Sequence, residues 1–446
     1  MKDTPRELVL NMLIAITEEQ TYSHLLIGDV LNKYNYWPSR DKDFVKRLTE
    51  GTLERLITLD YIIDHYSKLP TTKMKPLIKN LLRMSAYQIL YLDAIPDRAA
   101  CDEAVKLAGK RGFTSLRGFV NGILRTIVRQ KESLPLPDAT KEPLHYLSVV
   151  HSMPQWLIER WFGQLGQEKT VRLLDGLLAI RPVTVRLRGD LAPEDKRAWL
   201  DQLKAVGVKA TPHPYLPVAY ELTDVPGIRN LPGFAEGWFM VQDVSSMLVV
   251  DSAGLKPTDC LLDVCAAPGG KTLHAAERAA KVLAGDISAP KLALIQDNAI
   301  RMRMDNIEII EHDARVIQPS LVGKADVLLA DLPCSGLGII GKKRDIKYKI
   351  TPEAIEEIIA LQRDILRTVW QYVKPGGLMI YSTCTINRGE NEDMMKWFTE
   401  QFPFETEAFP PGALSLIGDQ TAMLQLLPGI HPTDGFFICR LRRNKV

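Results

Sequence analysis

Two cysteines of this chain lie in short motifs that suit thiol chemistry. Cys334 belongs to the run Asp-Leu-Pro-Cys-Ser-Gly at 331–336, and Cys384 belongs to Tyr-Ser-Thr-Cys-Thr at 381–385. Each motif closes an apolar run, which predicts that both cysteines lie just past buried strands. A free thiol is only a few per cent ionised at neutral pH, so a cysteine nucleophile needs surroundings that favour the thiolate. Cys334 and Cys384 are therefore candidates for covalent catalysis.

The other cysteines suggest no such role. Cys101, Cys260 and Cys439 are interpreted as small buried hydrophobes, the usual state of a free cysteine. No Cys-x-x-Cys pair and no matching histidine spacing occurs, so we expect no metal site. Six cysteines without framework spacing favour reduced thiols, as in a cytoplasmic protein.

The elements that would position the two cysteines begin at Asp259. Candidate strands cover residues 260–264, 281–284, 307–310, 327–330, 378–382 and 435–441, and helical stretches separate most of them. This pattern predicts an α/β fold with a mostly parallel, doubly wound sheet. Ligands of such sheets bind beyond the carboxyl ends of the strands. The polar residues expected at that edge are Asp286, Asp313, Asp331 and Cys384.

The first of these strands runs into a loop of small residues. The loop consists of Cys265, Ala266, Ala267, Pro268, Gly269, Gly270 and Lys271, and a helix follows. Small residues let the backbone approach a ligand, and the helix start offers free N–H groups to an anion. A phosphate-binding P-loop is the rival interpretation, but that motif needs glycine where this chain has Cys265. The three spaced glycines of a dinucleotide site are also missing.

Acids at the next strand ends point to an adenosine-type cofactor. Asp286 follows Asp263 by 23 residues, where an acid binds ribose hydroxyls, and Asp313 is a candidate partner of the adenine amino group. A single acid at a strand end is more often solvated, whereas acids at successive strand ends favour one shared ligand. An adenosine ligand without phosphates that carries an amino-acid carboxylate is S-adenosylmethionine, which we predict as cofactor.

A thiol and a methyl donor at one sheet edge suggest methyl transfer to carbon 5 of a pyrimidine. Carbon 5 of cytosine is a weak nucleophile, and thiolate addition at carbon 6 turns it into a reactive enamine carbon. A base must then remove the carbon-5 proton before the thiol can leave. Asp331 is a candidate to assist by hydrogen bonding to the protonated ring nitrogen. Single-stranded RNA would present the base at little cost.

The length of 446 residues predicts two or three domains. Residues 1–135 have helical periodicity, residues 150–250 mix helices and strands, and residues 251–446 form the α/β region. A proline-rich linker is expected between the first two, because residues 131–154 contain four prolines. No apolar run is long enough for a membrane span, and the first residues show no secretory signal, so we expect a cytoplasmic protein.

The net charge of +2 excludes a polycation, so RNA binding would need local basic patches. Residues 104–130 contain six bases and no acids, which favours either a solvated helix face or a phosphate contact. A second basic run lies at 342–347, and a third at 440–445 is equally well explained as a solvated tail. The candidate RNA contacts are Lys110, Arg111, Arg117, Arg125, Lys342, Lys343, Arg344 and Lys347.

The motifs at 265–272, 331–338 and 382–385 resemble those of the RNA 5-methylcytosine methyltransferases of the Nol1/Nop2/Sun family. Residues 1–130, with Phe-Val-Asn-Gly-Ile-Leu at 119–124, look like the NusB-type helical RNA-binding fold. The segments 237–247 and 434–437 also match the family. The NusB-like extension is similar to the bacterial subfamily that acts on 16S ribosomal RNA. The resemblance implies a Rossmann-like class I methyltransferase domain, preceded by a small RRM-like domain.

The resemblance also implies residue roles. Cys384 would be the nucleophile, Cys334 would help to release the product, and Asp331 would contact the cofactor edge or the target base. The loop 265–271 would hold the methionine part of the cofactor, with Asp286 on ribose and Asp313 on adenine. One departure is the run Gly-Lys-Lys-Arg at 341–344, where the family usually has two basic residues, histidine and proline.

These features predict a monomeric, S-adenosylmethionine-dependent methyltransferase of carbon 5 of a cytosine in small-subunit ribosomal RNA. Transfer RNA is the alternative substrate, because the catalytic motifs do not separate the two. A non-enzymatic RNA-binding factor with a degenerate methyltransferase body is a further alternative, against which the intact Cys334, Cys384 and Asp331 argue. The NusB-like region could also recruit proteins instead of RNA.

Overall fold

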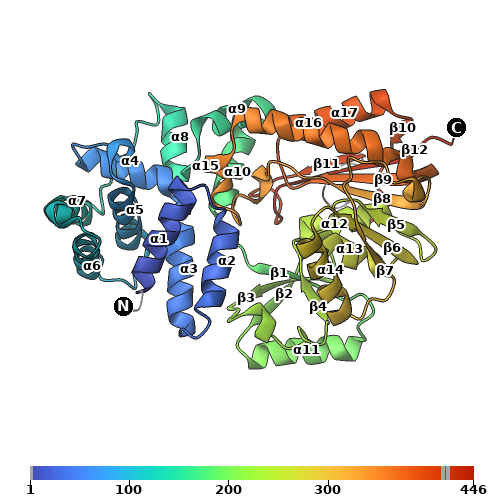
Figure 1. Ribbon diagram of the computed structural model, residues 1–446, viewed down its shortest axis with the longest axis horizontal. Helices are drawn as coiled ribbons and strands as arrows, with labels where there is room; N and C mark the ends of the chain where they lie inside the picture. The colour runs from blue at the N-terminus through green and yellow to red at the C-terminus, as the bar shows by residue number, and fades with distance from the viewer. Residues whose placement is uncertain (1–3, 413–416, 418–421, 446) are drawn as a thin grey trace. The chain divides into compact units, whose positions relative to one another are not determined.

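The computed structural model describes residues 4–412, 417 and 422–445. The chain divides into two compact units. The helical unit comprises the chain up to Leu178 together with Ile340–Ile350, and the sheet unit comprises Ala179–Ile339 together with Thr351 to the C-terminus. Figure 1 shows the helices of the first unit in blue and teal, with the short orange helix α15 from the later segment among them. No helix in the described part of the chain is long and apolar enough to cross a membrane.

The helical unit confirms the predicted all-helical N-terminal region. Thr4 caps the first helix, where its side chain accepts from the Glu7 N–H and Glu7 reaches back to the Thr4 N–H. Helices α1 to α7 pack around one apolar core that includes Leu10, Leu13 and Leu81. The helices are α1 (Pro5–Glu18), α2 (Ser23–Lys33), α3 (Ser39–Glu54), α4 (Leu56–Tyr66), α5 (Pro76–Tyr91), α6 (Asp97–Lys110), α7 (Arg117–Arg129), α8 (Pro143–His151), α9 (Gln155–Leu165), α10 (Gln167–Leu178) and α15 (Ile346–Lys349).

The boundary of this unit differs from the expected one. Helices α8 to α10 cover much of the region 131–178, and they belong to the helical unit, not to a separate domain that starts near residue 150. Thr58 of α4 donates to the Val149 carbonyl, and Arg55 donates to the Val150 carbonyl. These contacts attach α8 to α4. Pro143 begins α8 and Pro154 precedes α9, whereas Pro135 and Pro137 lie in the irregular stretch before α8.

A large sheet forms the centre of the sheet unit and confirms the predicted doubly wound fold. Its strand order is β10-β12-β9-β8-β5-β6-β7, with β11 beside β12, and the pairs from β9 to β7 are parallel. In Figure 1, β8 and β9 run between α16 and α17 on one face and α12 and α13 on the other. The strands are β5 (Cys260–Asp263), β6 (Lys281–Asp286), β7 (Ile307–Glu311), β8 (Ala325–Asp331), β9 (Val373–Thr383), β10 (Phe404–Thr406), β11 (Met423–Leu426) and β12 (Phe436–Arg443).

The helices of this fold are α12 (Val244–Ala253), α13 (Gly270–Ala276), α14 (Ala289–Arg301), α16 (Pro352–Val369) and α17 (Glu392–Gln401). Helices α13, α14 and α16 each connect two parallel strands of the large sheet. All six predicted strands are present, and β10 and β11 were not predicted because they are short edge strands. The apolar runs of β5, β8 and β9 are buried, which is why they are recognisable in the sequence.

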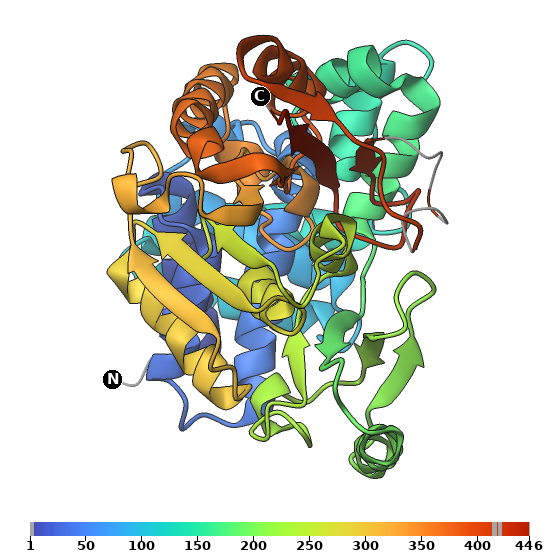
Figure 2. The same ribbon diagram turned by 90° about the vertical axis from the view of Figure 1, so that its right-hand side faces the viewer.

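A second, smaller sheet of order β2-β3-β1-β4 precedes the large one and is antiparallel throughout. Its strands are β1 (Val183–Leu187), β2 (Lys209–Pro212), β3 (Ala219–Thr223) and β4 (Phe239–Val241), and they appear in green in Figure 2. One helix, α11 (Pro193–Ala205), packs on the sheet through Trp199 and Leu203. A short 3-10 turn at Ile228–Asn230 stands where an RRM-like domain would have its second helix.

Candidate active site

The carboxyl ends of the parallel strands carry the acids and one of the two cysteines. Asp263 is the last residue of β5, Asp286 of β6 and Asp331 of β8, while Cys384 directly follows β9. Asp331 is paired in register with Ser382, two residues before Cys384. Parallel strands end at the same edge, so the fold gathers these residues as the alternating pattern predicted.

The structure brings the two cysteines into contact. The Sγ atoms of Cys334 and Cys384 lie 3.2 Å apart, and both side chains are half-buried. The hydrogen bond with Cys384, together with burial and the Cys384 charge, holds the pKa of Cys334 well above its usual value. The raised pKa favours Cys334 as the protonated member of the pair, which would make its S–H the donor toward the Cys384 sulfur.

A close approach of two glycines holds the Cys334 loop. The Gly338 N–H donates to the Cys384 carbonyl at 3.0 Å, and the Gly435 N–H donates to the Gly338 carbonyl at 2.9 Å. A Cβ atom at Gly338 would lie 2.0 Å from the Gly435 carbonyl oxygen, so no other residue fits there. The two glycines explain why the motif near residue 435 accompanies the two cysteine motifs.

Asp331 connects the cysteine motif to the cofactor loop. Its Oδ2 accepts from the Lys271 ammonium at 2.7 Å, and its Oδ1 accepts from the Ser382 hydroxyl at 2.7 Å. The Lys271 side chain is mostly buried, and its ammonium also lies 4.9 Å from the centre of the Phe436 ring. The sequence predicted both residues for the site, but not the ion pair that joins them.

A cavity of about 200 Å³ lies beside the cofactor loop. Gly269 begins the following helix in the left-handed conformation, with φ of 100°, and a Cβ there would lie 3.1 Å from Ile295. Cys265 faces the cavity as a thiol, because burial raises its pKa far above the usual range. The lining residues are Met240, Val241, Gln242, Asp243, Ser246, Asp263, Cys265, Ala266, Ala267, Pro268, Gly270, Lys271 and Asp331. The segment 240–246 was missed by sequence reasoning, because nothing local in it marks a ligand site.

Asp263 is a buried acid that lines this cavity. Its Oδ2 accepts from the Thr272 hydroxyl at 2.8 Å, whereas its Oδ1 has no hydrogen-bond partner among the described residues. Burial raises the pKa of Asp263 to about 7. A buried acceptor without a donor is costly, so a cationic donor in the cavity, such as the ammonium of an amino acid, would fit this position.

The two other predicted cofactor acids lie outside the lining of this cavity. The Asp286 carboxylate accepts from the N–H groups of Ala267 and Ser288 at 3.2 and 3.0 Å, which ties the end of β6 to the loop. Asp313 instead binds Arg315 at 2.7 Å, and this contact lowers the pKa of Asp313. Asp286 is next to the loop as expected, whereas Asp313 is engaged with its own neighbour.

The structure corrects the interpretation of the basic run at 342–347. Lys347 is buried in the helical unit, where its ammonium donates to the Glu54 carbonyl at 2.9 Å and burial lowers its pKa to about 7. Arg344 forms ion pairs of 3.1 Å with both Glu50 and Glu54. Lys347 is therefore wrong as a phosphate contact, because its charge never reaches the surface, and Arg344 is already neutralised.

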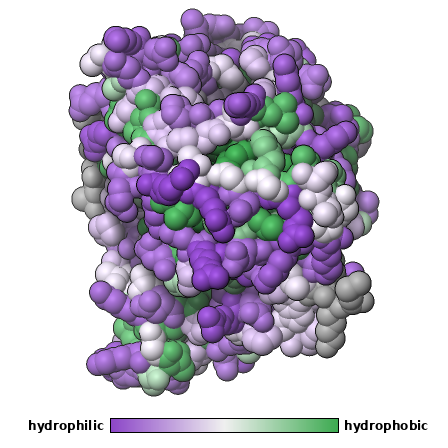
Figure 3. All heavy atoms as spheres, turned by 90° about the vertical axis from the view of Figure 1, so that its left-hand side faces the viewer, coloured by the Kyte–Doolittle hydropathy of each residue, from purple (hydrophilic) through white to green (hydrophobic). Residues whose placement is uncertain are grey.

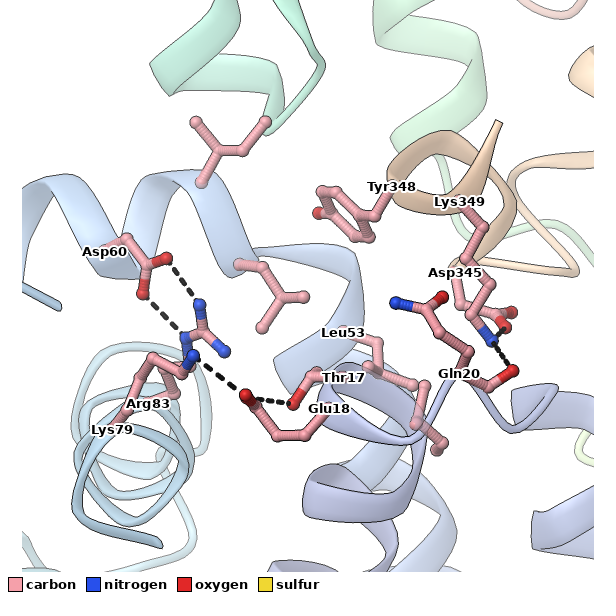
Figure 4. Close-up of a pocket in the computed structure, with 13 residues that line it drawn as sticks. Thr17, Glu18, Gln20, Leu53, Asp60, Lys79, Arg83, Asp345, Tyr348 and Lys349 are labelled. Atoms are coloured by element: carbon pink, nitrogen blue, oxygen red, sulfur yellow. Dashed lines mark hydrogen bonds and ion pairs between the residues drawn. The ribbon is translucent and has the colours of Figure 1, made fainter. Parts of the chain in front are cut away.

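The rest of this segment is anchored in the same way. Asp345 accepts from the Ser23 N–H at 3.0 Å and from the Lys349 ammonium at 2.8 Å. Tyr348, Asp345 and Lys349 line one side of a pocket of about 200 Å³ (Figure 4), and the Arg83–Asp60 pair lies across from them. The segment 340–350 is thus a structural part of the helical unit, in which Lys342 is exposed, Lys343 and Arg344 are half-buried and Lys347 is buried.

The first basic stretch does lie on the surface. Helix α7 buries Val120, Ile123, Leu124 and Ile127, and its opposite face exposes Arg117, Arg125 and Arg129. The end of the helical unit that carries α6 and α7 is predominantly hydrophilic in Figure 3. Lys110 pairs with Glu7 at 2.6 Å, and Arg111 donates to Asn11 at 2.8 Å, so these two are partly engaged.

The C-terminal bases are not a solvated tail. Arg440 and Arg442 belong to β12, and both bind Glu407, whose pKa falls to about 2 mainly through its hydrogen bond with Arg442. Arg440 is buried and also donates to the Ser252 and Ala253 carbonyls. These arginines support the edge of the large sheet.

Comparison with known proteins extends over the whole chain. The family model "16S rRNA methyltransferase RsmB/F" matches residues 253–442, and the NusB family model matches residues 3–129. The crystal structure of PH0851 covers 99% of this chain and 100% of its own, at 24% identity and a TM-score of 0.79, which supports the fold. NSun6 from Pyrococcus horikoshii covers 67% of this chain, at 22% identity and a TM-score of 0.58.

Two relatives carry the name of one enzyme. The probable ribosomal RNA small subunit methyltransferase B of Bacillus subtilis is 35% identical over 453 residues, which is 99% of each chain. The ribosomal RNA small subunit methyltransferase B of Klebsiella pneumoniae is 34% identical over 410 residues, which is 91% of each chain. With this identity over nearly its full length, the chain belongs to the family of ribosomal RNA small subunit methyltransferase B.

Proposed function

We propose that this protein methylates carbon 5 of a cytosine in 16S ribosomal RNA through a covalent bond between Cys384 and carbon 6 of the base. Its family makes it a ribosomal RNA methyltransferase that uses S-adenosylmethionine. The observation that carries the finer proposal is the pair of sulfurs, 3.2 Å apart, at the edge of the sheet where the cofactor loop lies. Methyl transfer to a nucleophilic oxygen or nitrogen would need no such pair.

The asymmetry of the pair favours Cys384 as the nucleophile. We infer that Cys334 is the thiol and donates its S–H to the Cys384 sulfur, 3.2 Å away, which would stabilise a thiolate there. The Lys271 ammonium lies at the same edge of the sheet, where it is bound to Asp331. A nucleophile needs the ionised form, so the acceptor of the pair is the better candidate.

The reaction divides between the two sulfurs. The Cys384 thiolate adds to carbon 6, and the electrons of the carbon 5–carbon 6 double bond form a double bond between carbon 4 and carbon 5. The negative charge that develops on ring nitrogen 3 would be bound by the Lys271 ammonium, which Asp331 holds. When bound, S-adenosylmethionine supplies the methyl group that carbon 5 accepts. A base then takes the carbon-5 proton, the carbon–sulfur bond breaks, and its electrons return to Cys384. The Cys334 S–H is placed to stabilise the departing thiolate.

Residues of the cavity suit the cofactor. Asp263 offers an unpaired buried acceptor to the ammonium of the methionine part, and the loop 265–271 offers backbone N–H groups to its carboxylate. Asp286, next to the loop at the end of β6, is proposed to bind the ribose hydroxyls. Asp313 would have to leave Arg315 to bind adenine.

The substrate choice rests on the relatives and on the helical unit. Both relatives are named for small-subunit ribosomal RNA, and the exposed arginines of α7 offer phosphate contacts. We propose that Arg117 and Arg125 bind the RNA backbone, that Lys342 and Lys343 contribute to it, and that the enzyme acts as a cytoplasmic monomer. The small sheet of β1–β4 is proposed to be RRM-like.

Labelled methyl transfer tests the proposal. The purified protein is incubated with methyl-labelled cofactor and, in separate reactions, deproteinised 16S ribosomal RNA and bulk transfer RNA from cells that lack the enzyme. Label at one cytosine of ribosomal RNA, mapped by bisulfite sequencing, is the expected result. Label confined to transfer RNA would overturn the substrate, and label on a position other than carbon 5 would overturn the chemistry. If naked RNA takes no label, the same assay on undermethylated 30S particles decides whether the substrate is an assembled one.

A further inference from the structure

A buried glutamate lies behind the two cysteines. Glu390 has no exposed surface, and its carboxylate accepts hydrogen bonds from four groups on three residues. Its Oε2 accepts from the Ser335 N–H at 2.8 Å and from Gln362 at 3.3 Å. Its Oε1 accepts from the Ser335 hydroxyl at 2.5 Å and from Asn387 at 3.0 Å. Every one of these partners is a donor, so the carboxylate is suited to its ionised form.

These bonds reach the residue that follows each cysteine. Ser335 follows Cys334, and Thr385 follows Cys384. Because the Ser335 hydroxyl donates to Glu390, it must accept from the Thr385 hydroxyl, which lies 2.7 Å away. The chain of bonds thus runs from Thr385 through Ser335 to Glu390. Through these hydrogen bonds, the Glu390 carboxylate fixes the loop of Cys334 relative to the loop of Cys384.

Glu390 is also linked to Pro333, the residue before Cys334. Gln362 donates both to Glu390 and to the Pro333 carbonyl. The Tyr381 hydroxyl donates to the Glu390 carbonyl at 2.6 Å and connects the residue to the end of β9. Cys334 is therefore held from both sides by groups that bind Glu390.

The charge of Glu390 is also unusual. Among the described residues, none forms an ion pair with it, although its side chain is fully buried. A buried carboxylate is costly and is retained only where hydrogen bonds satisfy it. Burial raises the pKa of Glu390. The pKa of Cys334 is held high by its hydrogen bond with Cys384, by burial and by the Cys384 charge, and the Glu390 charge raises it further.

We propose that Glu390 is a positioning residue that sets the contact between the two sulfurs and keeps Cys334 as the thiol, so that the role of nucleophile falls to Cys384. The inference deepens the proposed function and rests on it for the naming of the nucleophile. The bond network itself does not depend on the identity of the RNA. Without Glu390, Ser335 would lose two bonds, and Cys334 would lose a neighbouring negative charge that opposes its ionisation.

Thiol labelling of the free enzyme tests the charge. Wild type, Glu390→Gln and Asp326→Asn are pulsed with iodoacetamide from pH 6 to pH 10, and mass spectrometry gives the alkylation rate of each cysteine. Asp326 is a matched control, because it lies at the opposite end of β8 and binds Lys374. In Glu390→Gln, the Cys334 rate at pH 8 should rise about tenfold, the change that a one-unit fall in a thiol pKa produces. Unchanged Cys334 rates would overturn the proposal.

Two milder variants test the positioning and cover a failure of Glu390→Gln to fold. Glu390→Asp keeps the charge but shortens the reach to Ser335, and Ser335→Ala removes the hydroxyl that joins Thr385 to Glu390. Both should keep slow Cys334 labelling and wild-type KM for RNA, while kcat falls and a covalent protein–RNA adduct accumulates. Wild-type kcat in both variants would contradict the positioning role.

The two assays separate failure of this inference from failure of the proposed function. Labelling needs neither RNA nor turnover, so an effect of Glu390→Gln on Cys334 stands even if the wild type modifies no carbon 5. Conversely, the enzyme could methylate carbon 5 while Glu390→Gln leaves the labelling rate of Cys334 unchanged. That result would support the proposed reaction and contradict the proposed role of Glu390.

Discussion

The sulfur of Cys334 lies 3.2 Å from the sulfur of Cys384, although fifty residues separate them along the chain. The contact is asymmetric, because the pKa of Cys334 is held high by its hydrogen bond to Cys384 and by burial. The two cysteines are thus distinguished by their surroundings. The role of each can be tested by replacing it with alanine.

Cys384→Ala should abolish methylation. The variant lacks the sulfur that adds to carbon 6, so neither a product nor a covalent adduct is expected, with a loss of at least about a thousandfold in turnover. Cofactor binding, measured by calorimetry with S-adenosylhomocysteine, should stay near wild type, since Cys384 does not line the cofactor cavity. Turnover at the wild-type rate would assign the nucleophile elsewhere.

Cys334→Ala should trap the adduct. Without the Cys334 S–H, the departing Cys384 thiolate loses its hydrogen-bond donor, so breakdown of the protein–RNA bond slows. The measurement is a gel shift that survives denaturation, compared with the control Cys260→Ala at the far end of β5. If Cys334→Ala releases RNA as quickly as the control, Cys334 does not act in product release.

Cofactor affinity should rise with pH through the ionisation of Asp263. Burial raises its pKa to about 7, and the ammonium of the cofactor binds the ionised form, so affinity is present above pH 7 and lost as the pH falls. Below pH 7, the dissociation constant of S-adenosylhomocysteine should approach a tenfold increase per pH unit. In Asp263→Asn this slope should vanish, whereas Asp326→Asn should retain it. An equal slope in Asp263→Asn would move the ammonium site.

Lys347 should make the stability of the helical unit depend on pH. Burial lowers its pKa to about 7, whereas the unfolded chain keeps a lysine pKa of about 10.4. Between these values the unfolded chain binds a proton that the folded protein has released, so the stability of the wild type rises with pH. Lys347→Met should be the more stable below pH 7, and its advantage should shrink by about 2–3 kcal/mol between pH 7 and 9.5.

Denaturant unfolding, followed by helical circular dichroism at several pH values, measures this difference. Lys106→Met serves as the control, because Lys106 is largely exposed and pairs with Glu103 on its own helix. Parallel stability curves for wild type and Lys347→Met would show that the lysine is not held neutral inside the unit.

Local patterns were sufficient for the framework of the sheet unit. The apolar runs that became β5, β8 and β9 are buried on both faces, so they stand out in the sequence as short blocks that end at Asp263, Asp331 and Thr383. Parallel topology then requires those ends to meet at one edge, which is why the pattern of strands alone assigns the two cysteines and the cofactor loop to one site. The same holds for the helical periodicity of the N-terminal region.

The tertiary structure determined which charged residues are buried and which groups they bind. Lys347 stands in a basic run and Glu390 in the polar stretch Asn-Arg-Gly-Glu-Asn-Glu-Asp at 387–393, and both resemble surface residues in the sequence. Lys347 is buried against Glu54, nearly three hundred residues away, and Glu390 against Ser335, fifty-five residues away. Local patterns report the preference of a segment for helix or strand, but whether a charge meets water or a donor depends on contacts between distant segments. The sequence by itself therefore determined the chemistry and the sheet edge where it occurs, and only the folded chain determined which charges act there.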